Sequence, residues 1–415
     1  MITNNKLLFR FLVLFFMLLI FPFPLDVFPK FDFFEKLVPN IYQYIVPWIG
    51  EHILKLEEPI TVFENGSGDK TYDYVLLLFI LSIALLGAIL WSFLLKNANG
   101  YAKLNYWFLV LVRYSLGSTM IYYGLFKIMP LQFGEIAFWR MLQPYGDSSP
   151  MGLAWTFLGY SKGYNLFMGL AEFIGGILLF HRRTTLLGSL ILLPVTANIV
   201  AINFFYDVPV KLFSSQLLLM AIIIIVPDIK RLWNVIVFNK ATKKIEFENY
   251  FKSRKWAIRA TILKWAIVIL ILFNSISYTT GIYSKNIDKP ELYGLYEVNL
   301  FKRNRDTVPP ILNNEKRWRH VFFEYPNTTQ FSTMAKGRYG LRTEVDTLKK
   351  QIKLTEYNDT TAVYILKYKR TDSTLNLSGV FRKDTIFCET KRLDKKDFRL
   401  TSRGFNWVNE YPYNR

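Results

Sequence analysis

Long apolar runs dominate the first 280 residues of the chain, and most approach the length that crosses a bilayer. A membrane-spanning helix needs roughly 20 mainly apolar residues in succession. The runs are Leu7–Leu25, Tyr74–Leu95, Tyr106–Ile128, Tyr164–Phe180, Thr185–Tyr206, Leu212–Val226 and Trp256–Tyr278. This pattern predicts an all-α polytopic membrane protein with about seven helices in this part of the chain.

The pattern changes after residue 279, where apolar and polar residues begin to alternate. Val321–Tyr325, Thr361–Tyr368, Leu375–Val380 and Thr385–Cys388 alternate with a period of two and are separated by turn residues. Such alternation is typical of strands, so we expect a C-terminal antiparallel β domain, either a barrel or a sandwich. The aromatic stretch Arg403–Arg415 is predicted to close this domain as a strand, with a recognition edge as the alternative.

These patterns divide the chain into four parts. Residues 1–105 form an N-terminal pair of spans with a long periplasmic loop, and residues 106–228 form a four-helix membrane bundle. Residues 229–278 hold a basic cytoplasmic loop and the last span, and residues 279–415 form the β domain. The 35-residue loop Met129–Gly163 is predicted to be functional or a lid, because compact bundles rarely carry loops of that length. Interfacial anchoring by its aromatic residues is the alternative.

The formal net charge of +19 is unevenly distributed along the chain. Three alternate loops are basic, namely Lys96–Lys103, His181–Arg183 and Asp228–Lys255, and the opposite loops are neutral or acidic. Positive loops stay in the cytoplasm, so we expect a bacterial inner-membrane protein with a cytoplasmic N-terminus and a periplasmic C-terminal domain. The first apolar run is predicted to be a retained anchor, because no small-residue cleavage site follows it. Topology explains this charge better than binding to nucleic acid.

Cysteine and histidine usage limits the chemistry. The chain has one cysteine, Cys388, so it forms no internal disulfide or dithiol redox pair. Its three histidines, His52, His181 and His320, lack metal-ligand spacing, so no metal site is predicted. No cofactor is evident, although a quinone or lipid ligand fits a membrane bundle with buried polar groups.

Two charged residues lie within adjacent apolar runs at comparable depths. Arg113 lies seven residues from Tyr106, and Glu172 lies nine residues from His181. At 1.5 Å per residue these depths are roughly 10 and 14 Å. We expect the two charges to pair, because an unpaired charge in hydrocarbon costs several kcal/mol. A packing role is favoured, and a proton or ligand site is the alternative.

A second set of polar residues lies near the predicted outer face. Lys127 ends the third span, Asn203 and Asp207 end the fifth, and Lys211 opens the sixth, with Asn198 somewhat deeper. These residues are the candidate ligand or partner site. Ordinary snorkelling of terminal charges is the competing interpretation.

Several short motifs resemble the DoxX-like membrane protein family. They are Arg113–Gly117, Gly124–Lys127, Glu172–Gly176 and the basic turn His181–Arg183. The resemblance covers residues 106–228 and implies a four-helix membrane bundle there. The remainder is similar to an extended Bacteroidetes-type form with added N-terminal spans and a periplasmic tail. Name-giving members of the family are similar to a small subunit of a thiosulfate–quinone oxidoreductase.

Three functions fit these observations. The favoured one is a non-enzymatic accessory or scaffold subunit of a cell-envelope complex, bound to the lipid bilayer and to envelope protein partners. The second is a quinone-linked membrane oxidoreductase component with its ligand near Arg113, Glu172 and Asn198. The third is a small transporter or proton pathway that uses the same residues.

Overall fold

The computed structural model describes residues 5–28, 32–63, 68–95, 100–243 and 253–414. The chain forms two compact units, one of residues 1–134 and 149–282, and one of residues 135–148 and 283–415. We call them the helical unit and the barrel unit. The sequence boundary at residue 279 lies close to the second junction, whereas the assignment of residues 135–148 to the barrel unit was not expected. Parts of the predicted basic loops, residues 96–99 and 244–252, lie outside the described residues.

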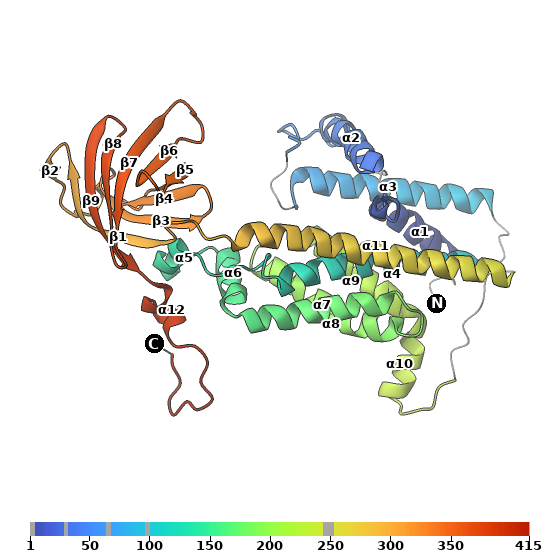
Figure 1. The fold of residues 1–415 in the computed structure, drawn as a ribbon. Helices are drawn as coiled ribbons and strands as arrows, with labels where there is room; N and C mark the ends of the chain where they lie inside the picture. Colours follow the sequence, from blue (N-terminus) through green and yellow to red (C-terminus); the bar gives the residue numbers. More distant parts are fainter. Residues whose placement is uncertain (1–4, 29–31, 64–67, 96–99, 244–252, 415) are drawn as a thin grey trace. The chain divides into compact units, whose positions relative to one another are not determined.

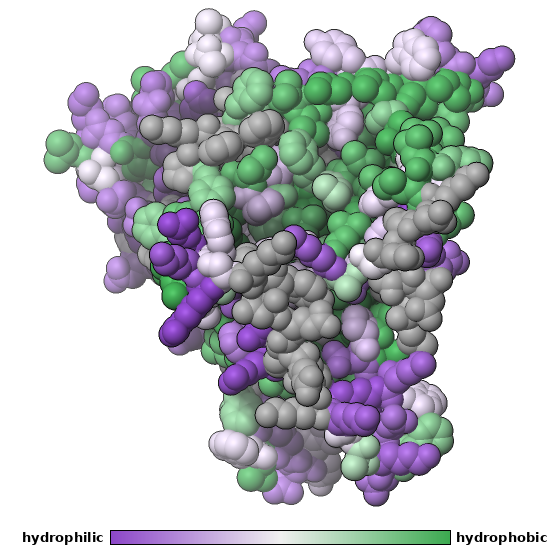
Figure 2. Space-filling view, turned by 90° about the vertical axis from the view of Figure 1, so that its right-hand side faces the viewer, coloured by the Kyte–Doolittle hydropathy of each residue, from purple (hydrophilic) through white to green (hydrophobic). Residues whose placement is uncertain are grey.

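The helical unit is built from long helices connected by short turns (Figure 1). Its helices are α1 (Lys6–Ile20), α2 (Asp32–Trp48), α3 (Thr71–Leu94), α4 (Ala102–Ile128), α6 (Pro150–Tyr160), α7 (Lys162–Leu179), α8 (Thr185–Phe205), α9 (Lys211–Ile225), α10 (Ile229–Ile236) and most of α11 (Arg254–Ile287). Each of the seven apolar runs therefore lies largely within a helix, although α1 ends at Ile20, before the predicted end of the first run at Leu25. Hydrophobic side chains cover much of the upper part of the face shown in Figure 2.

Five helical segments within the described residues are long and apolar enough to cross a membrane. They are Lys6–Val27, Thr71–Leu94, Thr185–Phe205, Lys211–Ile236 and Arg254–Lys285. The other two predicted spans correspond to α4 and α7, which carry the ionisable residues Arg113, Lys127 and Glu172. The count of seven spans thus remains a prediction, while several apolar helices are found.

Helices α4, α7, α8 and α9 pack in a ring, each against two of the others. Glycines bring α4 and α7 into backbone contact. A Cβ placed on Gly124 would lie 2.8 Å from the carbonyl oxygen of Gly169, and one on Gly117 would lie 3.0 Å from that of Gly176. Such small residues let two membrane helices approach closely. These contacts fix the antiparallel register of α4 and α7, and this register determines which polar side chains meet.

The barrel unit contains strands of one antiparallel sheet that closes on itself (Figure 1). In the described residues the strands are β1 (Gly294–Arg303), β2 (Asp306–Thr307), β3 (Trp318–Tyr325), β4 (Thr328–Thr333), β5 (Arg338–Asp346), β6 (Gln351–Thr355), β7 (Val363–Arg370), β8 (Leu375–Phe381) and β9 (Asp384–Leu393). Neighbouring strands pair antiparallel, β1 also pairs with β9, and β2 is a two-residue extension on β1. The domain is therefore an eight-stranded barrel rather than a sandwich, and the alternating stretches are confirmed as strands.

Apolar side chains at alternating positions fill the barrel. Trp318 and Phe331 are 2% and 1% exposed, and their ring centroids lie 4.4 Å apart. The unit also contains two short helices, α5 (Phe138–Leu142) and α12 (Arg399–Ser402). The backbone N–H of Phe138 donates to the Glu324 carboxylate, which ties α5 to β3.

The predicted closing strand at residues 403–415 is wrong for the part that the structure describes. Residues 403–414 form no strand and follow α12 as an extended loop. β9 closes the barrel instead, because its ladder with β1 already satisfies the edge that the tail was expected to cover. The aromatic side chains of the tail are exposed, with Trp407 at 91% and Tyr411 at 84%.

Candidate functional site

A buried ion pair joins the C-terminal end of α4 to the middle of α7. The Lys127 Nζ lies 2.8 Å from Glu172 Oε1 and 2.8 Å from Oε2, so both carboxylate oxygens accept from the ammonium. The two side chains are 6% and 2% exposed. The rings of Tyr123 and Phe133 flank the ammonium, with centroids 5.8 and 5.9 Å from Nζ. Two aromatic faces and a carboxylate thus replace the water that the lysine loses on burial.

The expected pair between Arg113 and Glu172 is not formed, and the direction of the side chains explains why. A helical Cα–Cβ bond leans towards the helix N-terminus. Because α4 and α7 are antiparallel, Lys127 leans towards the centre of the bundle, and Glu172 leans towards the level of Lys127. Arg113 leans towards the start of α4 and therefore away from Glu172. Depth alone did not distinguish the two cations.

Arg113 has a different partner at the other end of α7. Its Nε and Nη2 donate to the carbonyl oxygen of Leu179, the last residue of α7, at 3.0 and 2.8 Å. The final carbonyls of a helix lack intrahelical donors and carry partial negative charge. Arg113 therefore caps α7, which makes it a packing residue, and it lies outside the lining of the cavity described next.

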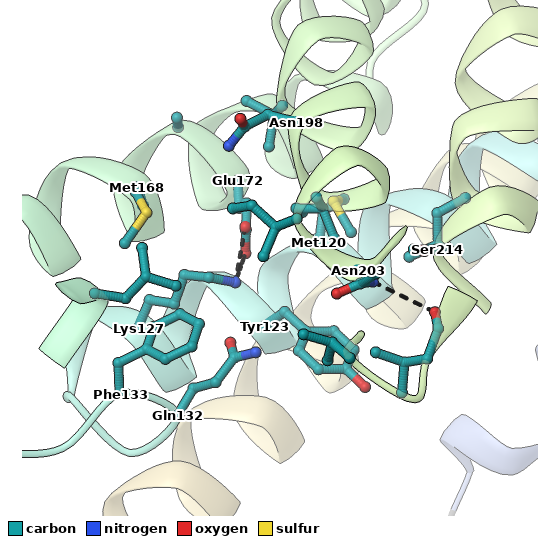
Figure 3. Close-up of a pocket in the computed structure, with 18 of the residues that line it drawn as sticks. Met120, Tyr123, Lys127, Gln132, Phe133, Met168, Glu172, Asn198, Asn203 and Ser214 are labelled. Carbon is teal, nitrogen blue, oxygen red and sulfur yellow. Dashed lines mark hydrogen bonds and ion pairs between the residues drawn. The ribbon is translucent and has the colours of Figure 1, made fainter. Parts of the chain in front are cut away.

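A cavity of about 490 Å³ lies beside the Lys127–Glu172 pair, between α4, α7, α8 and α9 (Figure 3). Most of its wall is apolar or aromatic, and a few polar groups gather around the ion pair. The apolar lining includes Met120, Phe133, Met151, Trp155, Leu158, Phe167, Met168, Ile199, Val208, Phe213 and Leu217. The lining residues with polar groups are Tyr123, Lys127, Gln132, Tyr164, Glu172, Asn198, Asn203 and Ser214.

One polar group in the wall is unsatisfied. The Oε1 atom of Gln132 is buried and has no hydrogen-bond partner among the described residues. Figure 3 shows its amide below Lys127 and beside Tyr123. A buried acceptor without a donor is costly, so it marks a position where a bound hydroxyl group or water is favourable.

The loop that follows α4 forms part of the cavity. Gln132 and Phe133 come from its start, and Trp155 comes from α6 near its end. Phe133 and Trp155 pack edge to face with centroids 5.2 Å apart. Asn165 at the start of α7 donates to the Phe133 carbonyl at 2.8 Å and holds this loop in place. The structure thus uses the segments of Met129–Gly163 that belong to the helical unit as one wall of the cavity.

The remaining residues of the predicted outer site separate into two groups. Asn198 and Asn203 line the cavity, and Asn203 also donates to the Val210 carbonyl at 3.4 Å. Asp207 and Lys211 pair with each other at 2.9 Å outside the lining, where the Asp207 side chain is 84% exposed. Glu172 was expected to pair with Arg113, apart from the predicted outer site. The structure instead places Glu172 in the same cavity lining as Lys127, Asn198 and Asn203. Asp207 and Lys211 lie outside that lining.

Some lining residues were not among the predicted site residues. Tyr123 lies one turn before Lys127, and Ser214 lies one turn after the start of α9. The position of Tyr123 on the same helix face as Lys127 was a usable signal, because residues four apart lie on one face, whereas no comparable signal indicated Ser214. Tyr164, Phe167 and Phe213 also line the cavity and are 39%, 68% and 41% exposed, so the cavity communicates with the apolar outer surface of the bundle.

The lining of the cavity has the composition of a small-molecule binding site. No group of three His, Cys, Asp or Glu residues that could hold a metal occurs among the described residues. Small-molecule sites are typically apolar, with a few convergent polar groups that orient the ligand. The cavity has this composition, with an apolar wall and a few polar groups that include the Lys127–Glu172 pair.

No family model and no solved structure matches this chain. The chain is similar to the uncharacterized protein YwoB of Bacillus subtilis, with 34% identity over 126 residues. The matched region covers 30% of this chain and 78% of the relative.

Proposed function

This chain belongs to the same family as YwoB of Bacillus subtilis, and we propose that its four-helix bundle binds one small amphipathic molecule of the quinone or lipid class. The observation that supports this most is the cavity of about 490 Å³ with its polar groups clustered around a buried ion pair. Pockets of roughly 300–1,000 Å³ hold small organic ligands and cofactors. The relative's name supplies no activity, so the proposal rests on the geometry.

The polar groups support a ligand with an uncharged oxygen-bearing head. An ammonium has three N–H donors, and the two oxygens of Glu172 engage two of them, which leaves one Lys127 donor for a ligand carbonyl. Gln132 Oε1 offers an acceptor for a ligand hydroxyl. The ion pair is neutral as a whole, so a neutral head enters without leaving an uncompensated charge.

The exposed part of the cavity wall supports a hydrophobic tail. Tyr164, Phe167 and Phe213 are apolar or aromatic, and they lie where the cavity meets the outer surface of the bundle. In a membrane that surface faces acyl chains, so a tail passes from the cavity into the bilayer without crossing water. This favours a ligand taken directly from the membrane.

The wider setting is proposed from the sequence. The bundle is proposed to be DoxX-like, on the motifs around Arg113, Gly124–Lys127 and Glu172–Gly176. The chain is proposed to lie in a bacterial cytoplasmic membrane with its N-terminus inside and the barrel unit in the periplasm, on the distribution of basic loops.

The test is the content of the cavity after gentle extraction of the chain with its surrounding lipid. Ala171 lines the cavity, so Ala171→Trp fills it, whereas the neighbouring Leu170 lies outside the lining and is 39% exposed. We expect one amphipathic molecule per chain to co-purify with the natural protein and with Leu170→Trp. Ala171→Trp should lose it while keeping the same abundance and thermal stability. The proposal fails if extracts of all three proteins hold the same bulk lipids and nothing in stoichiometric amount.

A scaffold role is the second candidate, and the exposed C-terminal tail is the observation in its favour. Phe405, Trp407 and Tyr411 are 78%, 91% and 84% exposed, as is typical of aromatic side chains that anchor interfaces. Truncation after Ser402 should release co-purifying envelope proteins if the tail docks them. Leu348→Ser, at a residue 94% exposed on a barrel turn, is the control.

A further inference from the structure

Helix α10 is short and strongly amphipathic. Its residues Ile229–Ile236 read IKRLWNVI. Ile229, Leu232, Trp233 and Ile236 follow the spacing i, i+3, i+4 and i+7, which places them on one face. Lys230, Arg231 and Asn234 lie on the opposite face.

The apolar face of α10 has no core to cover it among the described residues. None of its residues is buried. Ile229, Trp233 and Ile236 are 41%, 56% and 72% exposed, and the following Phe238 is 53% exposed. A cluster of large exposed apolar side chains on a folded protein usually contacts another apolar phase.

The position of α10 in the chain identifies that phase. It follows α9 directly after the short turn Val226–Asp228, which contains Pro227. In Figure 1 α10 runs across the long axis of α7 and α8 instead of continuing along it. If those long helices cross a bilayer, α10 lies along the bilayer surface at the end of α9, with its apolar face available to acyl chains.

The described residues that flank α10 along the chain are mostly basic where they are charged. Described residues 228–243 and 253–264 contain one acid, Asp228, which pairs with Arg231 at 3.5 Å. The basic residues of these ranges are Lys230, Arg231, Lys240, Lys243, Arg254, Lys255, Arg259 and Lys264. Basic clusters beside an amphipathic helix attract anionic lipid headgroups.

We propose that α10 is an interfacial helix that inserts its Ile229–Trp233–Ile236 face into the bilayer and recruits anionic lipid through the basic residues around it. Insertion removes the exposed apolar side chains from water, and the lysines beside them remain at headgroup level. The inference rests on the membrane placement proposed above and is independent of any ligand in the cavity.

The experiment uses the full chain with a Cys388→Ala background, in which single cysteines carry a nitroxide label. Trp233→Cys and Ile236→Cys report on the apolar face, and Lys230→Cys and Asn234→Cys report on the polar face. The proteins are reconstituted into vesicles of zwitterionic phospholipid with or without an anionic phospholipid. Collision with oxygen, which dissolves in the bilayer, is compared with collision with a water-soluble nickel complex.

We expect oxygen to dominate at positions 233 and 236 and nickel to dominate at 230 and 234. The contrast should deepen with anionic lipid. The combined Lys240→Gln and Lys243→Gln change should lose this lipid dependence, and the matched Lys→Arg changes should keep it.

Three results would overturn the proposal. Equal accessibility of both faces to nickel shows that the helix remains in water. Protection of positions 233 and 236 from both reagents shows that protein covers the face. A contrast that is the same in purely zwitterionic vesicles and survives the Lys→Gln changes shows that anionic lipid is not recognised. An Ala171→Trp chain should retain the α10 contrast, which separates this inference from the cavity proposal.

Discussion

Lys127 and Glu172 form an ion pair in the helical unit, with Nζ 2.8 Å from each carboxylate oxygen and both side chains more than nine-tenths buried. The pair lies in the wall of the cavity and joins α4 and α7, whose backbones approach closely at Gly124 and Gly169. It therefore joins the packing of the bundle to the proposed binding site.

Removing one partner of this pair should destabilise the bundle. Lys127→Met leaves the Glu172 carboxylate buried without a cation, and losing one partner of a buried pair costs about 3–5 kcal/mol. The Lys127→Met/Glu172→Met double variant should recover most of this loss. Thermal unfolding of the purified chain in detergent measures the difference.

The exposed pair Lys211–Asp207 is the matched control for that change. Because Asp207 is 84% exposed, Lys211→Met should alter stability by less than about 1 kcal/mol. If Lys127→Met lowers stability no more than Lys211→Met does, the Lys127–Glu172 pair is solvated and the buried site is incorrectly described.

The glycine contact between α4 and α7 should tolerate no side chain. A Cβ on Gly169 would lie 2.7 Å from the Gly124 carbonyl oxygen and 2.9 Å from the Ile128 amide nitrogen. Gly169→Ala should therefore lower stability by about 1–3 kcal/mol, as overpacking does. Gly281→Ala in α11, where no atom lies within 4 Å of the added carbon, should be neutral or slightly stabilising. Equal melting temperatures for the two variants would contradict the close approach.

Acid should weaken the barrel unit through His320. Burial, followed by the charge of Arg319, lowers the pKa of His320 to about 4 from an ordinary 6.5. Between these values the unfolded chain binds a proton that the folded chain does not, so stability falls as the pH decreases from 6.5 to 4. The loss reaches about 3 kcal/mol. His320→Gln should remove this dependence of stability on pH.

Cys388 provides the readout for that acid effect, because it is the single cysteine of the chain and is 0% exposed in the barrel core. Its modification by a disulfide reagent that reacts in acid requires the barrel to open, and the denatured chain at the same pH provides the reference rate. Burial raises the pKa of Glu324, which makes its contribution to stability change with pH in the opposite direction. Comparing His320→Gln with the natural chain therefore isolates the contribution of the histidine. If the stability of His320→Gln decreases with pH as much as that of the natural chain, His320 is not the source of the acid effect.

A test of the proposed membrane orientation requires an introduced cysteine. Burial raises the pKa of Cys388 to about 12, so a reagent should not label the folded barrel from either side of the membrane. Leu348→Cys, at a residue 94% exposed, should react in intact cells with a membrane-impermeant reagent restricted to the periplasm. Labelling only in inverted membrane vesicles would place the barrel in the cytoplasm.

Local patterns predicted the elements well and their contacts less well. Alternation at Val321–Tyr325 and Leu375–Val380 identified strands, because side-chain period is a local property. Whether the sheet closes depends on the pairing of β1 with β9, which are about 90 residues apart in the chain. For the same reason the aromatic tail was mistaken for the closing strand.

The candidate site was partly predictable. Lys127, Glu172, Asn198 and Asn203 were recognised as polar groups in apolar helices, and all four line the cavity. The partner of Glu172 was predicted incorrectly, because the depth of a residue along a helix does not account for the lean of its side chain towards the N-terminus of the helix. Asp207 has a positive φ of 52° in the turn after α8, and its side chain is exposed outside the cavity. Charge and position alone did not reveal that turn.

An experimental structure of the chain extracted with its native lipid tests the central claim most directly. The account predicts one non-protein molecule in the cavity, with a polar head within hydrogen-bond distance of Lys127 Nζ or the Gln132 amide and a tail leaving past Phe167. The same structure of Ala171→Trp should show the indole in that space. A cavity that is collapsed, or filled only by water, in the natural chain would contradict the proposed function.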